Sequence, residues 1–369
     1  MTMHCLPADT LTRIAASKRP LRIKFGIDPT RDRLHLGHFV PMRVARSMQD
    51  QGHELHLILG TLTAQLGDPS GQDTTRPILD EAVVKANAEK LLGQCQQVFR
   101  PGFVVHRNHE FVDAMSVPFF LMRLAGRITV KGMLSRNGFR SRMEADQAIG
   151  LHELLVPLLQ GWDSVEVRAD VEIGGTDQLF NFQVARQLQE AEGQTPELCV
   201  MTPVIRGTDG RKMSKSFDNA IWLDEAPEQM FGKVMSVSDE VMDEWIGLLT
   251  DLDPTTLPAH PMERKVALAR AIVTQLHGSD AADAADAHFT RTVRERVVLD
   301  TDCAEAPATD LLTLVVTVRG ESRSRSRKLI QGGGVRVDGA KVLDHTMTPD
   351  VGSLIRVGKR KVVRVVSAS

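Results

Sequence analysis

Two histidines stand three residues apart where a helix-like segment begins, and a glycine lies between them. They are His35 and His38, and the glycine is Gly37. In the first turn of a helix, side chains three apart share one face, and the free N–H groups and positive dipole end attract phosphate. Gly37 lets a nucleotide approach the backbone closely. We therefore expect a phosphate that gains charge during a reaction to bind here, although a His-x-x-His pair by itself is more often a surface pair or a metal site.

A second group of reactive side chains lies far downstream, in the run Lys-Met-Ser-Lys-Ser at residues 212–216. Such a run by itself is usually a solvated loop, but its combination with His-Leu-Gly-His is highly specific. With both runs, the chain resembles the class I aminoacyl-tRNA synthetases. The runs Gly-Gly-Thr-Asp-Gln at 174–178 and Leu-Leu-Gln-Gly-Trp-Asp at 158–163 narrow the resemblance to the bacterial tyrosyl-tRNA synthetases, from about Leu21 to the C-terminus.

The resemblance implies a two-step reaction. An amino-acid carboxylate attacks the α-phosphate of ATP, and a ribose hydroxyl at the 3′ end of tRNA(Tyr) then attacks the adenylate. Mg²⁺ travels with ATP, so no metal held by protein side chains is expected. The implied catalytic residues are His35, His38, Lys212 and Lys215. The implied ATP-binding residues are Asp28, Thr30, Gly37, Gly175, Asp177, Met213 and Ser214. The implied amino-acid-binding residues are Gly26, Asp68, Asn108, Val156, Gln160, Asp163 and Gln178.

Within the amino-acid pocket, the resemblance makes Asp163 the acceptor for the tyrosine hydroxyl. Gln160 and Asp68 then hold the α-ammonium group, with Asn108 nearby. Three positions depart from the family's pattern: Val156, Trp162 and Gln65. Val156 stands where the family usually has a tyrosine that contacts the ammonium group, so a tyrosine analogue is an alternative substrate.

The predicted elements place these residues on an α/β sheet. The alternating run Leu21–Ile27 predicts a strand that Pro29 stops, and a helix is expected at Phe39–Gln51. Further strands are predicted at His53–Gly60, Phe103–His106, Ser164–Ile173 and Leu198–Ile205, and further helices at Leu79–Phe99 and Thr176–Glu192, the latter capped by Thr176. This order predicts a Rossmann-like doubly wound parallel sheet with an inserted helical segment.

The predicted domains follow from the same pattern and from the resemblance. Residues 1–216 form the catalytic domain, with an insertion at about 110–155 that the resemblance makes the interface of a homodimer. Residues 217–299 form an α-helical domain for the anticodon arm, 300–309 a linker, and 310–369 a small α+β domain that resembles the S4 RNA-binding domains.

The C-terminal segment is strongly basic, although the whole chain carries a net charge of -2. From Leu311 onward, twelve basic residues face four acidic ones, a balance of +8. A basic face binds phosphates by releasing counterions. The expected RNA-binding residues are Arg323, Arg325, Arg327, Lys328 and Arg336.

The remaining composition bears on the location of the protein. The four cysteines are scattered without a Cys-x-x-Cys pair, so neither a zinc site nor a disulfide framework is indicated. This pattern fits a reducing cytosol. The first residues lack a signal-peptide pattern, and no apolar run approaches a membrane span, so we expect a cytoplasmic protein without a membrane partner.

The chain contains no tyrosine at all. One hypothesis is a second, inhibitor-resistant synthetase that is translated when charged tyrosyl-tRNA is scarce, with the pocket altered at Val156, Trp162 and Gln65; simple drift is the alternative. Two other functions stay open beside a tyrosine–tRNA ligase: a paralog that activates a tyrosine analogue, and a non-catalytic RNA-binding protein. The four implied catalytic residues argue against the last.

Overall fold

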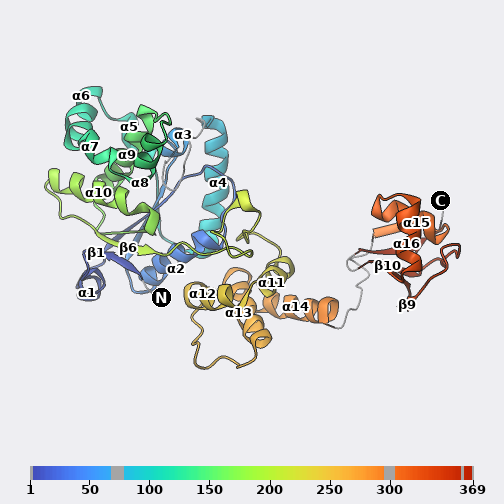
Figure 1. Ribbon diagram of the computed structural model, residues 1–369. Coiled ribbons are helices and arrows are strands. Elements are labelled where there is room, and N and C mark those ends of the chain that lie inside the picture. The colour runs from blue at the N-terminus through green and yellow to red at the C-terminus, as the bar shows by residue number, and fades with distance from the viewer. Residues whose placement is uncertain (1–2, 68–78, 295–303, 359–360, 368–369) are drawn as a thin grey trace. The chain divides into compact units, whose positions relative to one another are not determined.

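The structure, a computed structural model, describes residues 3–67, 79–294, 304–358 and 361–367 (Figure 1). It divides into two units, Met1–Asp286 and Ala287–Ser369. The predicted loop around Asp68 and part of the predicted linker, residues 300–303, lie outside the described residues.

A six-stranded sheet lies at the centre of the first unit. Its strands are β1 (His4–Leu6), β2 (Arg22–Ile27), β3 (Glu54–Leu59), β4 (Val104–Arg107), β5 (Val171–Gly175) and β6 (Leu198–Thr202). Their order is β1-β6-β5-β2-β3-β4, and all neighbours are parallel except β1 and β6. The chain winds outward in both directions from β2 and β5, which confirms the doubly wound sheet. In such sheets, ligands bind at the carboxyl ends of the strands where the order reverses.

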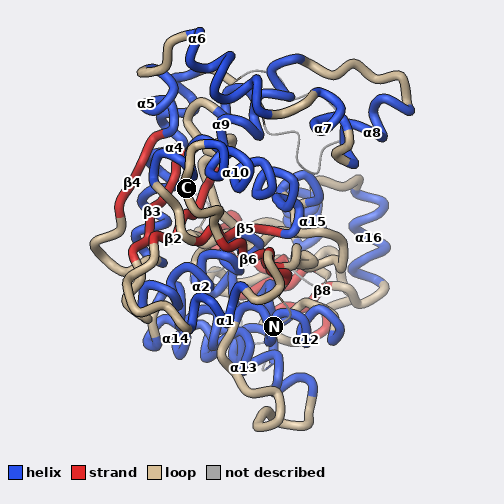
Figure 2. Tube along the Cα trace, turned by 90° about the vertical axis from the view of Figure 1, so that its left-hand side faces the viewer, coloured by secondary structure: helices blue, strands red, loops and turns tan. Residues whose placement is uncertain are grey.

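Helices cover both faces of this sheet. The sequence of helices before β6 is α1 (Thr10–Ala15), α2 (Leu36–Asp50), α3 (Thr63–Leu66), α4 (Glu81–Val98), α5 (Asn108–Asp113), α6 (Val117–Phe119), α7 (Val130–Leu134), α8 (Asn137–Glu144), α9 (Leu151–Val167) and α10 (Leu179–Ala191). A π-helical turn at Phe120–Leu124 and 3-10 turns at Ala125–Arg127 and Thr176–Gln178 join them. Helix α2 lies on one face, and the packed pair α9 and α10 lies on the other (Figure 2).

Two of the predicted elements around β5 are wrong. The segment predicted as a strand from Ser164 to Ile173 begins as the end of α9, and β5 starts only at Val171. Helix α9 is buried on nearly every side, so its sequence lacks the polar face that marks a helix. Thr176 does not cap α10 either, because the 3-10 turn precedes that helix.

The helix-rich segment after β6 forms the rest of the first unit, whose boundary at Asp286 falls within α14, the last helix of the segment. After a 3-10 turn at Lys215–Phe217 come α11 (Pro227–Met235), α12 (Asp239–Leu249), α13 (Pro261–His277) and α14 (Ser279–Phe289), which ends in a π-helical turn at Thr290–Arg294. These helices pack against the nucleotide fold through α2. Arg43 of α2 pairs with Asp251 at 2.6 Å and donates to the Leu248 carbonyl.

The second unit is a five-stranded sheet with two helices. Its elements are β7 (Ala304–Pro307), α15 (Leu311–Arg319), α16 (Arg323–Gln331), β8 (Val335–Val337), β9 (Ala340–Lys341), β10 (Leu354–Val357) and β11 (Lys361–Val366), with the strand order β7-β11-β10-β8-β9. The predicted Val-Arg-Val-Asp-Gly hairpin is confirmed, since Val337 pairs with Ala340. The predicted linker is wrong at 304–307, because β7 pairs in parallel with β11. Ala306 of β7 is buried in the core of the unit.

Among the described residues, no helix has the length and apolar character that crossing a membrane requires.

Candidate active site

A cleft of about 660 Å³ opens at the carboxyl ends of β2 and β5, where the strand order reverses. Most of the predicted site residues line it: Gly26, Asp28, Thr30, His35, Gly37, His38, Gln160, Asp163, Gly175, Asp177, Gln178, Lys212, Met213 and Ser214. Three other described residues of the predicted site do not line this cleft: Asn108, Val156 and Lys215. The cleft therefore brings together segments that lie up to about 190 residues apart in the sequence, as Gly26 and Ser214 do.

The two histidines are built into the start of α2. His35 is the N-cap, and its Nδ1 accepts a hydrogen bond from the N–H of Gly37 at 3.1 Å. The Nδ1 atom of His38 accepts from the N–H of His35 at 3.2 Å, which completes a capping box. A neutral imidazole that accepts at Nδ1 carries its proton on Nε2. Both rings thus offer Nε2–H donors to a ligand.

The histidines are held in the neutral form. Burial, with smaller contributions from His38 and Lys212, lowers the pKa of His35 to about 2. Burial lowers the pKa of His38 to about 4, although its hydrogen bond with the His35 backbone acts in the other direction. Two neutral donors can bind a phosphate oxygen without releasing a proton at pH 7.

Gly37 is required by this arrangement. A Cβ atom at this position would lie 2.8 Å from Cε1 and 2.9 Å from Nδ1 of the His35 ring. Any side chain would push that ring out of its cap, so the glycine preserves both the helix start and the position of the imidazole.

The Lys-Met-Ser-Lys-Ser loop forms another wall of the cleft. Lys212 lies 3.7 Å from Asp177 across the opening and is half-exposed. Lys215 faces a smaller adjoining pocket of about 240 Å³. The loop is shaped by Asn219, which is buried, accepts from the N–H of Ser214 at 2.8 Å and donates to the carbonyl of Lys212 at 3.0 Å. Sequence reasoning missed Asn219, because its role depends on the folded loop.

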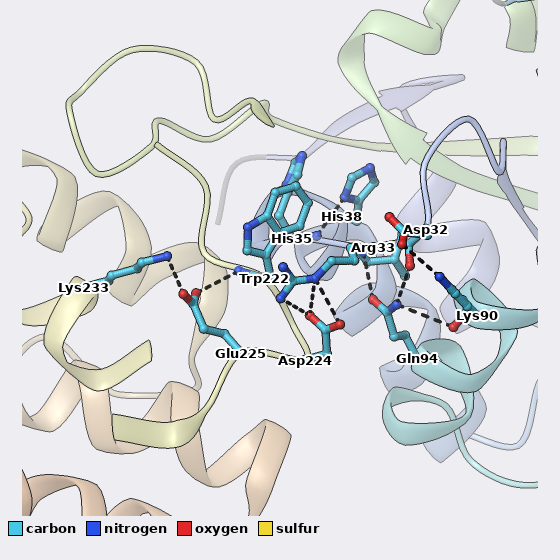
Figure 3. Close-up of polar contacts among 11 residues, drawn as sticks. Asp32, Arg33, His35, His38, Lys90, Gln94, Trp222, Asp224, Glu225 and Lys233 are labelled. Atoms are coloured by element: carbon cyan, nitrogen blue, oxygen red, sulfur yellow. Dashed lines mark hydrogen bonds and ion pairs between the residues drawn. The ribbon is translucent and has the colours of Figure 1, made fainter. Parts of the chain in front are cut away.

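Directly after this loop, the chain at residues 221–224 is fixed to the segment that carries the two histidines (Figure 3). Leu36 donates its N–H to Ile221, and Leu223 donates to Leu34, both at 2.9 Å, so His35 and Trp222 form an antiparallel bridge. We use the name Arg33 clasp for the side chains that reinforce this bridge. They are the side chains of Arg33, Asp224 and Trp222. Arg33 lies 2.6 Å from Asp224 and 4.9 Å from the centre of the Trp222 ring.

The Arg33 clasp has consequences for the mobility of the loop. Because the chain after the loop is fixed to the start of α2, any movement of Lys212 and Lys215 must be hinged between Arg206 and Ile221. Arg206 fixes the other end, since it pairs with Glu244 of α12 at 2.6 Å.

The opposite wall of the cleft carries a buried carboxyl group, Asp163 of α9. It is 3% exposed, and burial raises its pKa to about 8. Asn108 donates to Asp163 at 3.4 Å and to Thr63 at 3.1 Å, and Thr63 donates in turn to Asp28 at 2.7 Å. Asn108 thus acts from behind the wall, where it orients the carboxyl groups that face the cleft. Sequence reasoning missed Thr63.

The predicted ammonium-binding side chains are clamped by a residue that sequence reasoning also missed. Asn181 of α10 donates to the side-chain oxygens of both Gln160 and Gln178. Each amide oxygen has a second lone pair, so both can accept a further hydrogen bond from a ligand in the cleft.

At the floor of the cleft, which both residues line, Lys24 of β2 pairs with Glu172 of β5 at 2.7 Å, and both are almost fully buried. Their Cα atoms are direct partners in the sheet. Sequence reasoning missed this pair, although a lysine and a glutamate inside apolar parallel strands are a recognisable signal. Strands of this kind are buried on both faces, and a charge there requires a partner.

Three positions that the sequence placed in an altered pocket lie elsewhere. Val156 is fully buried in α9, one turn before Gln160, and Trp162 packs edge-to-face against Phe119 at 5.4 Å. Gln65 donates to the Thr61 carbonyl. None of them lines the cleft. They therefore do not contact a ligand in the described part of the cleft, and their effect on the choice of substrate stays a prediction.

In the second unit, the predicted RNA-binding side chains occupy one helix and one strand. Arg323, Arg325, Arg327 and Lys328 lie on α16 and Arg336 lies on β8, and all five are exposed. Ser322 caps α16 and Ile330 anchors it in the core, so this Ser-Arg run is a folded helix. Within the described residues, no group of three or more His, Cys, Asp or Glu side chains is placed to hold a metal ion.

Comparisons with known proteins agree with this geometry. The family model described as tRNA synthetases class I (W and Y) matches residues 16–294, and the S4 domain model matches residues 311–355. The tyrosine–tRNA ligase of Salinibacter ruber is 41% identical over 98% of this chain and 93% of its own length. That of Trichormus variabilis is 41% identical over 96% of this chain and 92% of its own.

Solved structures share the fold. A C-terminally truncated mitochondrial tyrosyl-tRNA synthetase of Aspergillus nidulans has a TM-score of 0.64 at 23% identity, over 77% of this chain and 88% of that one. The tyrosyl-tRNA synthetase of Archaeoglobus fulgidus, solved with L-tyrosine, has a TM-score of 0.60 at 18% identity, over 76% and 95% of the two chains.

Proposed function

The chain belongs to the class I tRNA synthetases of the W and Y family, and we propose that it activates tyrosine with ATP and transfers it to the 3′ end of tRNA(Tyr). The observation that carries the proposal is the pairing of two sites in one cleft. One wall holds the Nε2–H donors of His35 and His38, and another holds the buried carboxyl of Asp163. The relatives' names favour this function over an analogue-specific paralog or a non-catalytic RNA-binding protein.

In the first step, the tyrosine carboxylate attacks the α-phosphorus of ATP, and pyrophosphate leaves. Charge develops on the phosphate oxygens, where His35 and His38 donate hydrogen bonds. Lys212 and Lys215 close over the pyrophosphate from the mobile loop. Reactions of this type depend on positioning and on positive charge more than on covalent help, and Mg²⁺ bound to ATP supplies part of that charge.

The remaining cleft residues hold the two substrates. Asp177, at the carboxyl end of β5, binds the ATP ribose, with Asp28, Thr30 and Met213 around the nucleotide. The tyrosine ring enters beside Gly26, with its hydroxyl at Asp163. Gln160 and Gln178, clamped by Asn181, accept from the α-ammonium group. Asp68 and Val156 were predicted for this group as well; Asp68 lies outside the described residues, and Val156 lies behind the wall.

In the second step, a ribose hydroxyl of the tRNA end attacks the adenylate carbonyl carbon, and AMP leaves. The basic side chains of α16 and β8, Arg336 among them, contact the tRNA backbone by replacing its counterions. The helical region at 217–299 supports the anticodon arm in this proposal. The cytoplasm, where tRNA is charged, is the proposed location.

A homodimer is part of the proposal, with the insertion at 110–155 as its interface. Six large apolar side chains of this region are more than half exposed: Val117, Leu121, Met122, Val130, Met143 and Leu151. Apolar side chains gathered in this way are typical of an interaction site. Light scattering at working concentrations tests this part, and a monomer contradicts it.

The experiment that tests the function is the charging of tRNA with radiolabelled tyrosine by the full chain. We expect ATP-dependent incorporation that is lost in the Lys212→Ala variant. Incorporation that persists undiminished in that variant refutes the assigned role of the loop, and the absence of any incorporation by the wild type refutes the function.

A further inference from the structure

Lys24 lies at the floor of the cleft, and its three N–H donors are all directed at acceptors of the protein. Its ammonium group contacts Glu172 Oε1 at 2.7 Å, the Gln160 carbonyl at 2.8 Å and Ser164 Oγ at 2.8 Å. An ammonium group has three N–H donors and no acceptor. Lys24 therefore acts on a ligand only through other residues.

The residues that Lys24 holds determine the place of Asp163. Gln160 and Ser164 belong to the turn of α9 that carries Asp163, so the ammonium group pins this turn against the sheet. The charge of Lys24 also acts directly on Asp163. Burial raises the pKa of Asp163 most strongly, and Lys24 is the largest influence that opposes it.

Other groups from the surrounding elements also act on Asp163. Asn108 of α5 lowers its pKa by donating a hydrogen bond, whereas Glu172 of β5 and Asp28 after β2 raise it. Lys24 and Glu172 thus have opposite effects on the same carboxyl group, and the effect of Lys24 is the larger.

A second glutamate, Glu197, completes this buried group just before β6. It is 1% exposed, and neither of its carboxyl oxygens has a hydrogen-bond partner among the described residues. Burial and the neighbouring Glu172 raise the pKa of Glu197 well above its ordinary value. A buried carboxyl group without a partner is neutral, so Glu197 carries a proton, whereas Glu172 pairs with Lys24.

We propose that Lys24 and Glu172, with the neutral Glu197 beside them, form a buried charge-setting cluster that determines when Asp163 is ionised, and so determines recognition of the substrate's ring. The inference rests on the proposed function, in which Asp163 accepts the hydroxyl of tyrosine. Lys24 and Glu172 are positioning residues. They favour an aromatic amino acid whose ring bears a neutral hydrogen-bond donor, a hydroxyl or an amine, because an ionised Asp163 only accepts hydrogen bonds and binds such a donor more strongly than the neutral acid does.

The test is the pH profile of kcat/KM for tyrosine in ATP–pyrophosphate exchange by the full chain, which reports the ionisation of the free enzyme. Glu172→Gln removes a negative charge that disfavours ionisation of Asp163. We expect the acid-side midpoint to move down by about one pH unit, a roughly tenfold gain in kcat/KM on that limb. The double variant Lys24→Met/Glu172→Gln also loses the stronger, favourable charge, so its midpoint should move above that of the wild type.

The double variant has no charge at either position. In Glu172→Gln, the amide oxygen still accepts from Lys24, and Asp163 becomes the anionic partner of the ammonium group. Glu197→Gln replaces a neutral acid by a neutral amide, and we expect its midpoint to stay at the wild-type value. Glu190→Gln, which removes an exposed carboxylate on α10, is the matched control for loss of a charge.

The outcomes distinguish this inference from the proposed function. Midpoints that move in opposite directions in Glu172→Gln and in the double variant support the cluster; if the double variant does not fold, the downward shift in Glu172→Gln alone decides. A Glu172→Gln midpoint that is unchanged or raised overturns the inference, and a Glu197→Gln shift as large as that of Glu172→Gln overturns the protonated state of Glu197. A wild-type protein that shows no exchange with tyrosine refutes the proposed function itself, and the inference with it.

Discussion

Substitution of His38 separates the two roles that the structure gives to this ring. Its Nδ1 accepts from the His35 N–H at 3.2 Å, and its Nε2–H is the only donor that it can offer to a phosphate. Loss of one preorganised donor at a developing charge typically costs about 3 kcal/mol of barrier, or roughly a hundredfold to a thousandfold in kcat. Loss of a helix cap costs about 1 kcal/mol of folding free energy. His38→Ala should show both losses.

Two further variants at this position separate the loss of the donor from the loss of the helix cap. Glutamine or glutamate at the third helical position reaches back to the N-cap N–H, so His38→Gln and His38→Glu should both keep wild-type stability in urea unfolding. Only the glutamine has a donor to offer. In ATP–pyrophosphate exchange we therefore expect His38→Glu to be at least as slow as His38→Ala, and His38→Gln to be faster than either. Wild-type exchange by His38→Ala would refute the donor role.

Three other predictions follow from the described contacts. Burial raises the pKa of Asp163 to about 8 in the folded chain, above its ordinary value of 3.8. The folded state therefore binds the proton more tightly, and its free energy of unfolding falls as pH rises from about 4 to 8; Asp163→Asn should weaken this dependence in urea unfolding, and an identical slope would contradict it. Arg33→Ala breaks the Arg33 clasp and should raise the KM for ATP while the KM for tyrosine stays unchanged, with Arg270→Ala, far from the cleft, as the control; equal changes in both constants would refute the clasp's role. In salt titrations of tRNA binding, Arg325→Ala and Arg327→Ala should each reduce the slope by about one, without affecting ATP–pyrophosphate exchange; unchanged slopes would remove these residues from the interface.

The sequence was most informative where local chemistry alone determines structure. Pro29 ends β2, and the His-Leu-Gly-His run begins a helix whose cap the histidines provide, so this part of the cleft could be predicted from neighbouring residues. The hairpin at Asp338 was predictable for the same reason, since an Asp-Gly pair favours the turn between two short strands.

The sequence was least informative where an element is buried on all sides, because its residues then show no regular repeat of apolar and polar positions. Helix α9 is apolar around its circumference because the sheet lies on one side and the insertion on the other, and its end was taken for a strand. Long-range pairs were also hard to derive. Lys24 and Glu172 each stand out as charges in apolar strands, but their pairing depends on strand register, and the role of Asn219 depends on the folded loop.

The most direct test of the account is ATP–pyrophosphate exchange measured with each of the twenty amino acids and with tyrosine analogues. The account predicts exchange with tyrosine, weaker exchange with ring-amine analogues, and very little with phenylalanine, which would leave the buried acceptor Asp163 without a donor. Exchange that is as fast with phenylalanine as with tyrosine, or no exchange with any amino acid, would contradict the central claim that this cleft recognises and activates tyrosine.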